Sequence, residues 1–144
     1  MKSRREAREI VLKVLYRMEA TGDSAEEAYN DICMNWSSSP FDEVYARRLL
    51  KKIITNTEYI YTILKNIVKN WDIERIAIID RNILCIAICE VLYFDDIPPK
   101  VSMDEAIEIA KIYSTSDSGK FVNGILDRVV RRKRQGEKKG KTNS

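Results

Sequence analysis

The chain has 144 residues, a length that suits one domain with a sizeable hydrophobic core. Hydrophobic residues make up 44% of it and charged residues 33%, with five Gly and three Pro, and these proportions favour a helical protein over a β protein. No apolar run approaches the roughly 20 residues that span a bilayer, and the charged amino terminus lacks a signal peptide, so we expect a cytoplasmic protein.

The net charge of +3 hides an uneven distribution. Residues 128–144 hold eight Lys or Arg and one Glu, or +7, whereas the preceding 127 residues hold 17 positive and 21 negative side chains, or −4. A basic end indicates a polyanion as a partner, although many such tails are only solvated and disordered. We predict one helical domain over residues 1–134 and a disordered basic tail over residues 135–144.

Signatures of catalysis and of cofactor binding are missing. The sequence has no His, which excludes the usual Ser-His-Asp and Cys-His arrangements, and no Gly-rich loop matches a phosphate-binding fingerprint. Cys85 and Cys89 are one helical turn apart, but without His or a second Cys pair a zinc site is improbable, and reduced core cysteines are the better interpretation. We therefore expect a binding protein that is no enzyme and holds no cofactor or metal.

Hydrophobic periodicity predicts about seven helices, one of them very short, and no strand. The expected helices cover residues 3–19, 24–36, 41–70 with a break at 55–57, 74–77, 79–94, and two more within 97–130. The helix at 79–94 is apolar on nearly every side, which predicts a central, buried helix. Asp80 lies in its first turn, where we expect it to stay accessible, and the sequence assigns no partner to Glu90.

The first predicted helix carries two surface features. Arg4 and Arg8 lie toward one margin of its apolar stripe, with Arg5 further round. Leu12 and Tyr16 project on the same outer side, and an exposed Tyr beside a Leu next to arginines is a candidate contact patch. The alternative is a second layer of the protein's own core.

The last two predicted helices have clear start and stop signals. Pro98 and Pro99 end the preceding helix, and Ser102, three residues before Glu105, has the spacing of a capping box. In the final helix Phe121 falls beside the apolar stripe, in line with Arg128. An aromatic ring flanked by guanidinium groups can stack a nucleobase and hold a phosphate, or it can be an edge aromatic shielded by arginine stems.

An ordered set of motifs resembles one known family. The set comprises SRREARE at residues 3–9 with the following LeuTyr and Glu19, DRNIL with Glu90, IPPKV, DEAIEIAK and FVNGILD. Together they are similar to the NusB family of bacterial transcription antitermination factors over about residues 3–130.

The resemblance implies an all-α fold of two small packed helical bundles. It also implies a protein that binds boxA RNA together with the ribosomal protein NusE, within an antitermination complex on RNA polymerase that supports ribosomal RNA transcription. The expected RNA-binding residues are Lys2, Arg4, Arg5, Arg8, Asp117, Phe121 and Arg128, with Asp117 moderating the affinity. The expected NusE-binding residues are Leu12, Tyr16, Glu74 and Asp80.

One position departs from the family pattern. The family often has an RNA-contacting Arg where this chain has Cys85, so that contact is not carried over, and the basic tail is a candidate to compensate for it. Two alternatives to the RNA-bound state with NusE are a homodimeric scaffold with a masked RNA surface and an accessory RNA-binding module of a ribosomal RNA methyltransferase.

Overall fold

The structure, a computed structural model, describes residues 3–36, 40–68 and 73–142 and is all-α over them, as the sequence predicts. Seven α-helices and one 3₁₀ turn follow one another along these described residues. They are α1 (Arg4–Thr21), α2 (Ala25–Trp36), α3 (Glu43–Thr55), α4 (Thr57–Ile67), η1 (Ile73–Arg75), α5 (Ile78–Tyr93), α6 (Pro99–Tyr113) and α7 (Ser118–Thr142).

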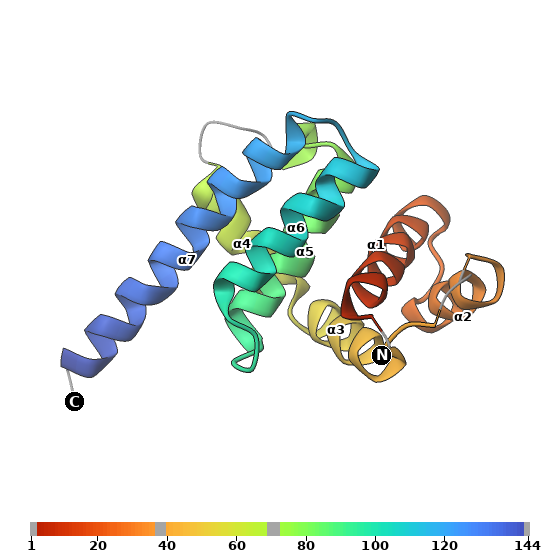
Figure 1. Ribbon diagram of the computed structural model, residues 1–144, viewed down its shortest axis with the longest axis horizontal. Helices are drawn as coiled ribbons and strands as arrows, with labels where there is room; N and C mark the ends of the chain where they lie inside the picture. The colour runs from red at the N-terminus through yellow and green to blue at the C-terminus, as the bar shows by residue number, and fades with distance from the viewer. Residues whose placement is uncertain (1–2, 37–39, 69–72, 143–144) are drawn as a thin grey trace.

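The helices form two bundles that share α5 (Figure 1). Helix α1 packs against α2 and α3, whereas α6 packs against α7, and α5 contacts members of both groups. Eleven of the 16 residues of α5 are buried, because the helix is apolar all round and has neighbours on every side. The predicted central helix and the predicted pair of bundles are thus confirmed.

The start of α1 is fixed by local hydrogen bonds. Ser3 is its N-cap, and the Ser3 hydroxyl accepts a hydrogen bond from the backbone N–H of Glu6 at 3.2 Å. The Ser3 carbonyl accepts a second bond, from the backbone N–H of Asp42 at 3.3 Å, just before α3 begins. The beginning of α1 is therefore held beside the beginning of α3.

The beginning of α6 differs from the prediction. The helix begins at Pro99, three residues before Ser102, because proline is well suited to the first helical position. Ser102 is buried inside the helix, so Ser102 and Glu105 form no capping box, and the Glu105 carboxylate is available to another helix.

Helix α7 is longer than expected. It continues to Thr142, beyond the residue at which we predict that the domain ends and a disordered tail begins. The division at residues 134 and 135 stays a prediction. No helix in the described part of the chain is both long and apolar enough to cross a membrane.

Candidate nucleic-acid and partner interface

Arg5 lies at the surface and is paired with a carboxylate of α6. Its Nε and Nη2 atoms donate to the two oxygens of Glu105 at 2.6 and 3.0 Å, a bidentate arrangement that fixes the plane of the guanidinium group. The hydrogen bond from Arg5 lowers the pKa of Glu105. Arg5 is thus an oriented cation on the outside of the protein.

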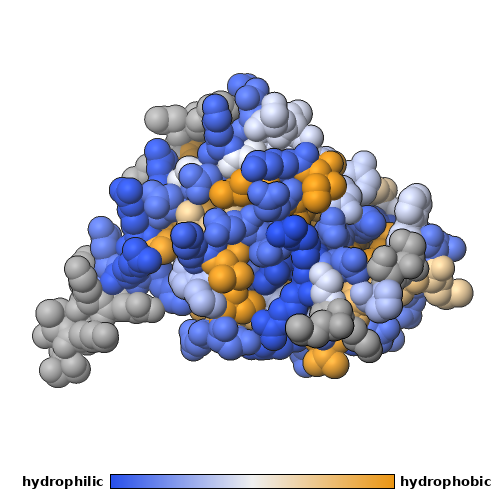
Figure 2. Space-filling model, in the orientation of Figure 1, coloured by the Kyte–Doolittle hydropathy of each residue, from blue (hydrophilic) through white to orange (hydrophobic). Residues whose placement is uncertain are grey.

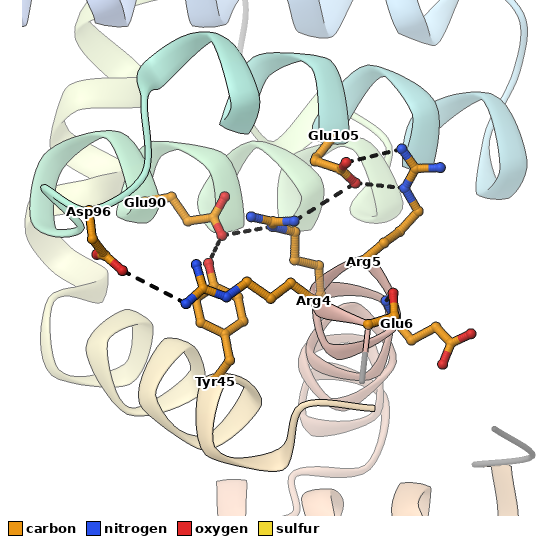
Figure 3. Close-up of polar contacts among 9 residues, drawn as sticks. Arg4, Arg5, Glu6, Tyr45, Glu90, Asp96 and Glu105 are labelled. Atoms are coloured by element: carbon orange, nitrogen blue, oxygen red, sulfur yellow. Dashed lines mark hydrogen bonds and ion pairs between the residues drawn. The ribbon is translucent and has the colours of Figure 1, made fainter. Parts of the chain in front are cut away.

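Arg8, one turn further along α1, lies inside the protein. Its Nε donates to Glu90 Oε2 at 2.7 Å, and the Tyr45 hydroxyl donates to the same oxygen. All three side chains are buried, and Figure 3 shows Tyr45 of α3 and Glu90 of α5 pointing toward each other. Burial raises the pKa of Glu90, while the charge of Arg8 acts in the opposite direction.

Arg4 rests on the outer side of this buried cluster. Its guanidinium carbon lies 4.6 Å from the centre of the Tyr45 ring, within cation–π range, and its Nη2 lies 3.9 Å from Asp96 Oδ2. Arg48 of α3 donates to the other Asp96 oxygen at 3.3 Å and lowers the pKa of that carboxyl group. Figure 3 shows Asp96 beside Arg4 and Glu105 beside Arg5.

A hollow of about 470 Å³ opens between these side chains. Figure 2 shows that this side of the molecule is mainly hydrophilic, with separate hydrophobic patches near its centre. The hollow combines cations with the apolar surface of the α5–α6 connection, which is the composition that an RNA strand needs for phosphates and bases. Its lining residues are Ser3, Arg4, Arg5, Arg8, Asp96, Ile97, Pro98, Val101 and Glu105.

Phe121 and Asp117 lie together at the start of α7. The backbone N–H of Phe121 donates to the Asp117 carbonyl at 3.3 Å, so the two residues are one turn apart. Asp117 is exposed, whereas Phe121 is half-buried and packs against the core. Seven residues further along α7, the exposed Arg128 donates from Nη1 to the Ile67 carbonyl at the end of α4, at 3.2 Å.

A second, apolar groove of about 370 Å³ lies on another part of the molecule. Leu12 forms part of its buried wall, while the Tyr16 side chain is 49% exposed and Trp36 is 62% exposed. Exposed aromatic residues around an apolar groove are typical of protein–protein contacts. The lining comprises Leu12, Lys13, Tyr16, Arg17, Ala20, Thr21, Ile32, Trp36, Ile79 and Tyr113.

Asp80 is buried, so the prediction that it stays accessible is wrong. Ser118, the first residue of α7, donates its hydroxyl to Asp80 Oδ2 at 3.1 Å and draws the carboxylate inward. Asp80 does not line the apolar groove, but its neighbour in the chain, Ile79, does. Glu74 is exposed in η1. Lys2 lies outside the described residues.

The sequence matches a family model described as the NusB family over residues 5–131. The chain belongs to the NusB family. It is similar to the transcription antitermination protein NusB of Salinibacter ruber, with 44% identity over 90% of this chain and 82% of that protein. The NusB of Methylacidiphilum infernorum is 43% identical over 91% of this chain and 92% of that protein.

Solved structures of the NusB family share the fold. A structure of T. maritima NusB aligns with a TM-score of 0.80 and 38% identity, over 91% of this chain and 93% of that one. A crystal structure of antitermination factors NusB and NusE in complex with dsRNA aligns with a TM-score of 0.81 and 25% identity, over 90% of this chain and 96% of that one.

Cys85, where the resemblance implies an RNA-contacting Arg in the family, is buried in α5. Burial raises the pKa of the Cys85 thiol to about 12, so the group is neutral at physiological pH. Cys85 therefore presents neither charge nor surface to a ligand in this structure.

Sequence reasoning missed the groups that support the arginines. Tyr45, Glu90 and Glu105 come from three different helices, and no local pattern links them to α1. One signal was available: a carboxylate in an otherwise apolar helix needs a buried cation, and Arg8 lies at the margin of the apolar stripe of the first helix. Trp36 was also missed, although an aromatic residue at the end of a helix next to a Ser-rich loop is a candidate for exposure.

Proposed function

We propose that this NusB-family chain is a transcription antitermination factor that binds boxA RNA together with NusE, as part of an antitermination complex on RNA polymerase in the cytoplasm. The observation that carries the proposal is the separation of two surfaces, a hollow edged by oriented arginines and an apolar groove edged by exposed aromatic residues. The NusB and NusE structure with dsRNA supports the same pair of partners.

On the RNA side, Arg4 and Arg5 supply positive charge at the surface. Each is held by a carboxylate, Asp96 or Glu105, so binding a phosphate means exchanging one anion for another. This exchange favours a ligand that fits the fixed guanidinium positions over any diffuse polyanion. Arg8 is buried, and we assign it the role of holding α1 in place rather than of touching RNA.

Phe121, Asp117 and Arg128 supply the α7 side of the proposed RNA surface. Phe121 is half-buried, and we assign it the role of stacking on an unpaired base, which is worth about 1–3 kcal/mol in single-stranded RNA recognition. The exposed Asp117 carboxylate, four residues before Phe121, repels phosphates and limits the affinity. The negative charge of Asp117 thus opposes the attraction that Arg128 exerts on the same RNA.

On the partner side, Tyr16 and Glu74 are exposed and are assigned direct contact with NusE. Leu12 and Asp80 are buried and support this surface from behind. A large aromatic ring at the rim of an apolar groove is the usual anchor of such an interface. Burying Tyr16 against a partner removes apolar surface that the free protein exposes.

The test is a fluorescence anisotropy titration of labelled boxA RNA with the protein, with and without purified NusE. We expect NusE to raise the RNA affinity, and the Arg5→Ala plus Phe121→Ala variant to lower it in both conditions. The affinity should fall as salt rises, because phosphate contacts release counterions. No response to NusE and none to the double substitution would refute the proposal.

A homodimer is the second candidate, because the same apolar groove could be covered by another copy of the chain. Size-exclusion chromatography with light scattering, with and without NusE, separates the two cases. If the groove is the shared surface, adding NusE should dissociate the dimer. Adding RNA alone should leave the dimer intact.

A further inference from the structure

A third hollow, of about 320 Å³, lies where the middle of α7 passes the end of α4 (Figure 1). Three guanidinium groups and two side-chain amides line it, a donor set that suits a phosphodiester. Its lining residues are Asn66, Ile67, Arg128, Arg131, Arg132 and Gln135. No groove residue and no residue of the hollow at the start of α1 is among them.

The cations of this hollow are only partly neutralised by the protein. Arg128 donates to the carbonyl of Ile67, a favourable arrangement at the negative end of the α4 dipole, and it thereby fixes α7 against α4. Arg131 pairs with Asp127 at 3.0 Å, but its side chain is 72% exposed, so the pair is weak in water. Among the side chains that the structure describes, Asp127 is the one carboxylate paired with any of these three arginines.

The hollow lies on the same line of α7 as Phe121. Residues 7 and 11 positions after Phe121, which are Arg128 and Arg132, return to nearly the same helical direction at 100° per residue. At 1.5 Å per residue, Arg132 is about 16 Å from Phe121 along the helix axis. A strand with one base against Phe121 can therefore continue along α7 to these arginines.

We propose that this hollow is a second phosphate-binding site for RNA, which holds the backbone of nucleotides beyond those bound at Phe121. The proposal rests on the proposed RNA-binding function and extends it. Arg132 and Gln135 lie beyond the family match, which ends at residue 131, whereas the other lining residues lie within it. It contributes affinity without reading bases, because its donors are suited to the backbone.

The experiment compares two labelled RNAs, boxA alone and boxA extended by uridines, one version at each end, in anisotropy titrations over a range of salt. The proteins are wild type, Arg131→Gln with Arg132→Gln, and a control, Arg47→Gln with Lys51→Gln, which removes the same charge from exposed positions on α3 outside the hollow. Thermal unfolding verifies that all three proteins are folded.

We expect wild type and control to bind one extended RNA more tightly than boxA alone, and the α7 variant to lose that gain, about fivefold in affinity. Its slope of log affinity against log salt should fall by about 1.4, for two lost single-strand phosphate contacts. If wild type binds boxA but the α7 variant keeps the full gain, this inference is overturned while the proposed function stands. If wild type binds no RNA, the proposed function itself fails. If the α7 variant loses only affinity for NusE, the hollow is a protein contact and the proposal is wrong.

Discussion

Arg8 on α1 and Glu90 on α5 are 82 positions apart in the chain and form an ion pair inside the protein, with 2.7 Å between Arg8 Nε and Glu90 Oε2. The Tyr45 hydroxyl of α3 donates to the same carboxylate oxygen, so three helices meet at one buried charge. The pair fixes the direction in which α1 leaves the core. Arg4 and Arg5 lie on the same helix, so the Arg8–Glu90 pair also helps to fix where these two surface arginines lie.

We predict that Arg8→Met lowers the free energy of unfolding by about 3–5 kcal/mol, because it leaves the Glu90 carboxylate buried without its cation. Arg8→Met combined with Glu90→Gln should cost less than the sum of the two single changes, since the double variant buries no charge. Urea denaturation of the four proteins measures the difference. Strict additivity would show that the two side chains are energetically independent.

The ion pair between Arg5 and Glu105 should make stability depend on pH in the acid range. The pKa of Glu105 lies below its ordinary value of 4.5 in the folded protein, chiefly because Arg5 donates to it. Its stabilising contribution is therefore complete above about pH 4.5 and is lost as the pH falls through the lowered pKa. Part of the pair is exposed, so we expect about 0.5–1 kcal/mol.

The check is to compare wild type with Glu105→Gln by chemical denaturation between pH 3 and pH 7. The stability difference should be largest at neutral pH and should shrink toward the acid end. Lys111→Gln, which removes an exposed partner of Glu108, is a suitable control with little dependence on pH. A difference that grew with acidity would contradict the assigned direction.

The three cysteines should react at different rates in the native protein. Burial raises the pKa of the Cys85 and Cys89 thiols to about 12, whereas Cys33 is half-buried near the end of α2. We expect iodoacetamide at pH 8 to modify Cys33 first, because alkylation needs both access and thiolate. Mass spectrometry of the native protein measures this order. The Cys33→Ser protein should stay unmodified until urea is added.

Substitutions at Leu12 and Tyr16 should have different effects, the first on stability and the second on partner binding. Leu12→Ala removes a buried side chain and should cost about 2–5 kcal/mol of unfolding free energy. Tyr16→Ala removes an exposed ring, so its effect on stability should be small, while its effect on NusE affinity should be large. Thermal melts and calorimetric titration with NusE measure the two effects, and equal losses of stability would contradict the assignment.

The fold was readable from the sequence because its helices are amphipathic or uniformly apolar and have local stop signals. Gly22 illustrates such a signal: its φ of 78° is the left-handed conformation that ends α1, and its N–H closes the last turn on the Met18 carbonyl. The start of α6 was misplaced because two local rules competed, and the proline at the first helical position prevailed over the serine cap.

The site was only partly readable, because burial decides what a polar residue does. Arg4, Arg5 and Arg8 look alike in a sequence, yet the structure exposes two of them and buries the third under α3 and α5. Asp80 appeared accessible at a helix start, but it is drawn inward by Ser118, 38 positions later. Contacts at such separations depend on how helices pack and leave no local pattern.

Because α5 belongs to both bundles, neither bundle has a core of its own. The chain should therefore unfold in a single cooperative transition, and a fragment that ends before α5 should not fold alone. The position of α5 in both bundles should also affect which substitutions are tolerated there. A change of volume at one α5 position, such as Leu84 or Ile88, disturbs packing toward several helices at once, so compensating substitutions should arise together on both sides of the molecule.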